Sequence, residues 1–173
     1  MIMPAGKPLL LPVNPRFVTL SLVLALLLQM ALGLSGQRWL PDVLALVLAF
    51  WSVQQPRLVG MGAAFLLGLA IDVHESALLG QNALSYVLLS YLVLRLYRRL
   101  QGFGASEQAL QVLPIFLLAS AAEWLVRLLA GDGWPAWTQW LAPLLQALLW
   151  PSVSWLLLAP QRRAHAPDDI RPL

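Results

Sequence analysis

The stretch FVTLSLVLALLLQMALGL, residues 17–34, indicates the class of protein to which this chain belongs. It contains no charged side chain and no proline, and it approaches the ~20 apolar residues that cross a bilayer as a helix. The residues before it, with Lys7 at their centre, resemble the start of a signal peptide, but the run is long and lacks an Ala-x-Ala-type cleavage site. We therefore predict that it is retained as a membrane helix.

The composition of the whole chain agrees with this prediction. Of 173 residues, 60% are hydrophobic and only 11% are charged, whereas a soluble domain carries about a quarter charged residues. A chain of this length holds about six spanning helices with short loops and leaves no room for a soluble catalytic domain. The absence of cysteine excludes disulfides, cysteine nucleophiles and thiolate metal sites. The net charge of +3 does not indicate a nucleic acid partner, because the basic residues lie between apolar runs.

Five further apolar runs follow the first one. They are residues 40–53, 58–71, 78–94, 110–129 and 141–159. Each run is continuous, whereas the strands of a membrane barrel alternate apolar and polar residues. We therefore predict an all-α membrane protein, a bundle of about six transmembrane helices over residues 16–160. Residues 1–15 are predicted to be a flexible cytoplasmic arm, and residues 161–173 a flexible cytoplasmic tail.

The second and third runs are short for membrane helices. About 14 residues of helix span roughly 21 Å, less than the roughly 30 Å of the hydrocarbon core. Either their polar flanks enter the interface, or the helices end early, or the two runs form a re-entrant hairpin.

The distribution of basic residues orients the bundle. With both termini in the cytoplasm, the outside loops hold only Arg38, which satisfies the positive-inside rule. The inside segments then hold Lys7, Arg16, Arg57, Arg95, Arg98, Arg99, Arg162, Arg163 and Arg171. Four tryptophans would form an outer interfacial belt, namely Trp39, Trp134, Trp137 and Trp140.

Small residues recur along the third run. Gly60, Ala64 and Gly68 are spaced by four and lie on one helical face, which Asp72 continues. Such a face lets two membrane helices approach closely. It serves either internal packing of the bundle or the docking of a partner's membrane helix.

Two ionisable residues lie inside the fifth run. Glu123 and Arg127 are four positions apart, so they share a helical face and can pair. Because charges in membrane helices are costly and rarely face lipid, we predict an intramembrane ion pair, with contact to a partner or ligand as the alternative.

The chain offers little for catalysis. Asp72, His74 and Glu75 lie close together at the end of the third run, but metal sites and catalytic carboxylate pairs usually draw on separate elements. There is no Gly-x-Ser-x-Gly elbow and no phosphate-binding glycine loop followed by lysine. We expect no enzyme activity, no metal and no cofactor.

A basic cluster closes the fourth run. Arg95, Arg98 and Arg99 are predicted to face the cytoplasm. They serve topology and anionic lipid contact, or they form a docking site for an acidic partner.

An ordered set of short motifs lies in the middle of the chain. A Pro-Asp helix start is followed by a loop with proline and a basic residue, a helix ending Gly-Leu-x-x-Asp, and then Leu-Gly-x-x-Ala-Leu. The positions concerned are Pro41, Asp42, Pro56, Arg57, Gly68, Asp72, Gly80, Asn82 and Tyr91. In the order and spacing of these motifs the chain resembles the MreD family of rod-shape-determining proteins.

This resemblance implies a non-enzymatic component of the cell-wall elongation machinery in the bacterial inner membrane. It implies association with MreC, a single-span protein, and through it with the polymerase RodA, a class B transpeptidase and the filament protein MreB. It also implies a fold similar to the S-components of vitamin transporters. The alternative function is therefore a solute-binding transporter subunit, which would need a polar pocket that Glu123, Arg127, Asn82 and Gln146 could line. An intramembrane enzyme is the third class.

Overall fold

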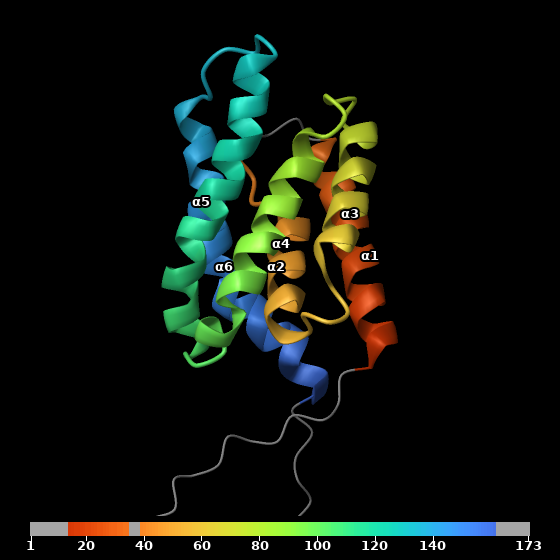
Figure 1. Ribbon diagram of the computed structural model, residues 1–173, viewed down its shortest axis with the longest axis vertical. Helices are drawn as coiled ribbons and strands as arrows, with labels where there is room; N and C mark the ends of the chain where they lie inside the picture. Colours follow the sequence, from red (N-terminus) through yellow and green to blue (C-terminus); the bar gives the residue numbers. More distant parts are fainter. Residues whose placement is uncertain (1–13, 35–38, 162–173) are drawn as a thin grey trace, which may run out of the picture.

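The structure of the protein is a computed structural model that describes residues 14–34 and 39–161. Over these residues the chain forms six α-helices that pack side by side in one bundle, and it contains no strand (Figure 1). The helices are α1 (Pro15–Gly33), α2 (Val43–Gln54), α3 (Met61–His74), α4 (Gln81–Leu100), α5 (Ala105–Leu129) and α6 (Leu141–Leu158), with the 3-10 turns η1 (Trp137–Trp140) and η2 (Ala159–Gln161) at either end of α6. The predicted six-helix, all-α architecture is confirmed.

Three stretches of the described chain are long and apolar enough to cross a membrane. They are Pro15–Gly33, Ala105–Leu129 and Trp137–Gln161. The helices α2 and α3 have only 12 and 14 residues, as the short runs predicted. The helix α4 extends beyond the apolar run that predicted it, because it continues through the three arginines to Leu100.

The bundle has two chemically different ends. The start of α1 lies at the same end as η2, the α2–α3 connection and the α4–α5 connection (Figure 1). We call this the arginine end, because it carries the exposed side chains of Arg16, Arg57, Arg95, Arg98 and Arg99. The two ends of the described chain thus lie together, as an even number of passes requires. The cytoplasmic assignment of this end follows from the positive-inside rule and stays a prediction.

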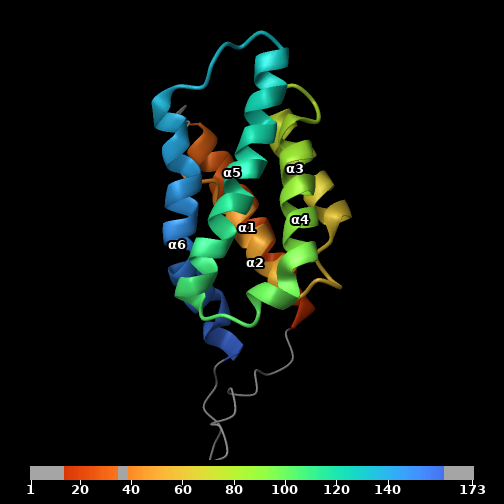
Figure 2. The same cartoon turned by 60° about the vertical axis from the view of Figure 1, so that its left-hand side comes forward.

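The opposite end carries the α3–α4 turn and a longer connection from α5 to α6 (Figure 2). The tryptophans of that connection, Trp134, Trp137 and Trp140, are exposed. We call it the cavity end, because a cavity opens there between the helices. The predicted arm, residues 1–15, and the predicted tail, residues 161–173, lie almost wholly outside the described residues. Within these residues, α1 begins at Pro15 and η2 ends at Gln161.

The helix α2 forms the centre of the bundle. All ten residues from Leu44 to Val53 are buried, because α1, α4 and α6 surround it. A helix that is apolar on every side is typically buried, either in protein or in lipid. Its Trp51 packs edge-on against Phe50 and donates a hydrogen bond from Nε1 to Ser21 Oγ on α1 at 2.8 Å.

Candidate functional site

A cavity of about 440 Å³ opens between the helices at the cavity end. Every one of the six helices contributes to its wall. Its polar lining residues are Gln29, Asp42, His74, Glu75, Asn82, Ser85, Tyr86, Ser120, Glu123, Arg127, Gln139 and Gln146. A volume of this size is typical of small-molecule sites, but such sites are usually mostly apolar. The strongly polar lining is therefore the unusual feature of this bundle.

Asp42 links three helices at the wall of the cavity. Its Oδ1 accepts a hydrogen bond from the Ala45 backbone N–H at 2.9 Å, so the side chain caps α2. Its Oδ2 accepts a hydrogen bond from the Tyr86 hydroxyl on α4 at 2.6 Å. Its backbone carbonyl accepts one from Gln146 Nε2 on α6 at 3.3 Å. One residue thus fixes where α2 begins relative to α4 and α6.

Asp72 holds the first turn of α4. The side chain is fully buried at the end of α3, and its carboxylate accepts hydrogen bonds from the backbone N–H groups of Gly80 at 2.8 Å, Asn82 at 2.8 Å and Ala83 at 3.4 Å. The first N–H groups of a helix have no partner within the helix, and Gly80 has no side chain to supply one. Gly80 adopts φ +100°, which favours glycine. Asp72 therefore caps the N-terminus of α4, in place of the side chain that Gly80 does not have.

The small-residue face of α3 is filled by α4 of the same chain. A Cβ placed on Gly68 would lie 2.4 Å from Ala83 Cα and 2.6 Å from its backbone nitrogen. Ala64 is fully buried, whereas Gly60 precedes the helix with open space around it. The hypothesis of a docking groove for a partner helix is therefore corrected to internal packing at Ala64 and Gly68. The glycine is required because only it lets the two backbones come so close.

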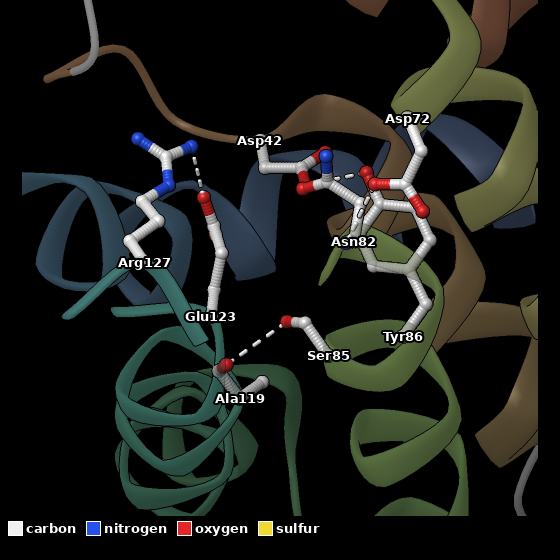
Figure 3. Close-up of polar contacts among 8 residues, drawn as sticks. All are labelled: Asp42, Asp72, Asn82, Ser85, Tyr86, Ala119, Glu123 and Arg127. Carbon is white, nitrogen blue, oxygen red and sulfur yellow. Dashed lines mark hydrogen bonds and ion pairs between the residues drawn. The ribbon is translucent and has the colours of Figure 1, made fainter. Parts of the chain in front are cut away.

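The ion pair predicted inside α5 is present. Arg127 Nη2 donates to Glu123 Oε1, and both side chains line the cavity with partial exposure. With the Gln81 amide oriented so that its oxygen faces the guanidinium, that oxygen also accepts from Arg127 Nε at 2.7 Å. Figure 3 shows Glu123 and Arg127 on α5 opposite Asp42 and Asn82. The same face of α5 is tied to α4 lower down, where Ser85 Oγ donates to the Ala119 carbonyl at 2.9 Å (Figure 3).

The family model described as "rod shape-determining protein MreD" matches residues 11–159, a range that contains all six helices. The chain belongs to the MreD family. The Rod shape-determining protein MreD of Haemophilus influenzae is 32% identical over 142 residues, which cover 82% of this chain and 87% of that protein. No solved structure matches the chain, so the similarity to transporter S-components stays a prediction.

The family assignment makes this chain a rod-shape-determining membrane protein. Several residues that carried the sequence resemblance to MreD lie around the cavity or support its wall. Asp42 and Asn82 line it, while Gly68, Asp72 and Gly80 set the α3–α4 contact beside it. The sequence did not predict a role for Tyr86, because its partner Asp42 lies 44 positions away and no local pattern indicates the contact.

The basic cluster of this MreD-family chain lies at the other end of the molecule. Arg95 stacks over the Tyr91 ring at 5.3 Å, and Arg98 lies 5.8 Å from the Tyr97 ring centroid and donates from Nε to the Tyr97 hydroxyl at 3.1 Å. Both guanidinium groups are exposed. They neither reach the cavity nor pair with an acid among the described residues. Lipid contact and docking of an acidic partner both stay predictions for them.

Proposed function

We propose that this MreD-family protein is a non-enzymatic component of the cell-wall elongation machinery of the bacterial inner membrane, and that it binds the membrane helix of an MreC-like single-span protein. The observation that carries the proposal is the family match over all six helices. Through this partner the protein would act with a RodA-type polymerase, a class B transpeptidase and MreB. Its part is to fix the position of the partner's outer domain relative to those enzymes.

We propose that the partner helix docks on an outward face of α3. The close contact of Gly68 with Ala83 of α4 and the burial of Ala64 support this choice, because they leave no room for another helix on the small-residue face. The opposite side of α3 offers Gly62 without any neighbour within 4 Å of a Cβ, together with exposed Phe65 and Leu66. Small residues beside large apolar ones suit close packing of helices in lipid.

A pull-down at native expression level tests this proposal. The tagged protein is solubilised in mild detergent, and co-purifying membrane proteins are identified by mass spectrometry, with an unrelated multi-span protein carrying the same tag as the control. We expect an MreC-like single-span protein and wall synthases. Leu66→Arg should reduce their recovery while the bundle stays folded.

A second candidate function is favoured by one observation. The polar pocket that a solute-binding transporter subunit would need is present, and Glu123, Arg127, Asn82 and Gln146 all line it. Recovery of an ATPase with its membrane coupling protein in the same experiment, without the single-span partner, would replace the first proposal with this one.

A further inference from the structure

The size of the cavity suits a small molecule. Its wall is built from all six helices, and it has a volume of about 440 Å³ and is open at one end of the bundle. Small-molecule sites typically occupy roughly 300–1,000 Å³.

The charges that line the cavity do not balance. The wall carries the carboxylates of Asp42, Glu75 and Glu123, against the single guanidinium of Arg127. Arg127 is already paired with Glu123. His74 donates from Nε2 to the Met30 carbonyl at 3.1 Å. Two carboxylates, of Asp42 and Glu75, are thus left without a cationic partner among the described residues. A cleft lined by an excess of one sign of charge attracts ions of the opposite sign, here a cation.

Two buried amides on the wall have unused hydrogen-bonding capacity. Asn82 Nδ2 and Gln146 Oε1 have no partner among the described residues, although both side chains are more than nine-tenths buried. One of these atoms is a donor and the other an acceptor. Such groups cost free energy when they stay unpaired. A hydroxyl group, which both donates and accepts, can satisfy either one.

We propose that the cavity binds a small organic cation that also carries hydroxyl groups, of the amino-alcohol class. The ammonium lies toward Asp42 and Glu75, and the hydroxyls lie toward Asn82 and Gln146. A bare metal ion fits less well, because no three acidic or imidazole side chains of the described chain come together as metal ligands do. An anion fits less well, because the Arg127 guanidinium is already paired with the carboxylate of Glu123. This inference goes beyond the proposed scaffold role and is independent of it.

Three matched polyols test the proposal on the full chain in detergent. Glucamine, sorbitol and gluconate share one hydroxylated carbon chain and differ at one end, which is a cation, a neutral group or an anion. We expect saturable binding of glucamine by isothermal titration calorimetry, at least tenfold tighter than that of sorbitol, and no binding of gluconate. Tm should rise by about 3 °C at roughly ten times the Kd of glucamine.

Variants locate the site. Asp42→Asn keeps a side chain that can cap α2, and it should weaken glucamine binding at least tenfold. Glu75→Gln alters an exposed residue at the mouth, so folding is not at risk, and it should weaken binding several-fold. Glu107→Gln removes the same charge at the start of α5, at the arginine end, and should leave the affinity unchanged.

Three results would overturn the proposal. They are equal binding of sorbitol and glucamine, unchanged affinity in both Asp42→Asn and Glu75→Gln, or no binding of any of the three polyols at millimolar concentration. None of them would affect the pull-down, so the two proposals fail separately.

Discussion

The two ends of this bundle handle charge in opposite ways. At the arginine end five guanidinium groups are exposed on short connections and helix ends. At the cavity end the carboxylates of Asp42 and Glu123 line the cavity, and Asp72 is fully buried with three backbone N–H donors. The first arrangement depends on solvent or lipid headgroups. The second depends on partners within the fold, so we expect stability to be far more sensitive to changes at the cavity end.

The largest effect is expected where the two backbones meet beside the cavity. Gly68→Leu would place a side chain against the Ala83 backbone, which cannot move without shifting α4. We expect a loss of about 3 kcal/mol or more of unfolding free energy, measured by thermal unfolding in detergent. Gly62→Leu is the control, because nothing lies within 4 Å of its Cβ position. Equal Tm values for the two variants would contradict the close packing of α3 and α4.

A smaller effect is expected from removing the cap of α4. Asp72→Ala leaves three backbone N–H groups, two of them buried, without their acceptor. Hydrogen bonds to a charged group contribute about 1.5–3 kcal/mol each, but the start of α4 can partly relax when the carboxylate is removed. We therefore expect the free energy of unfolding to fall by about 2–3 kcal/mol. Asp72→Asn keeps one acceptor oxygen and should be intermediate in the same unfolding assay. A wild-type Tm for Asp72→Ala would show that α4 does not need this carboxylate.

The smallest effect on stability is expected from replacing arginine by glutamine, a change that can be made at both ends of the bundle and compared directly. Arg127→Gln leaves Glu123 without its partner inside the bundle. We expect the free energy of unfolding to fall by about 1–2 kcal/mol, a modest loss because both side chains are partly exposed to solvent. Arg98→Gln at the arginine end should leave Tm unchanged, since its guanidinium is exposed. If Arg98→Gln lowers Tm as much as Arg127→Gln, the distinction between the two ends is wrong.

The sequence predicted those features that depend on local composition. Six apolar runs gave six helices, and the spacing of Glu123 and Arg127 gave their ion pair. The helix ends were less well predicted at α4, because arginines at a membrane surface continue a helix as readily as they end an apolar run.

The features that could not be predicted all depend on distant contacts. No local pattern shows that α2 is the central helix, since apolar residues on every side suit lipid as well as protein. The small-residue face of α3 looks the same whether it packs on α4 or on another protein. The cavity was foreseen only as a requirement of the transporter alternative, because it forms where residues as far apart as Asp42 and Gln146 meet.

The contact between Asp72 and the start of α4 also bears on how the protein is made. Its partners lie only eight to eleven positions further along the chain, and Gly68 meets Ala83 in the same short stretch. Everything that joins α3 to α4 is thus present before α5 is synthesised. The two helices can enter the bilayer during translation as one closed hairpin, in which the N–H groups at the start of α4 already have Asp72 as their acceptor.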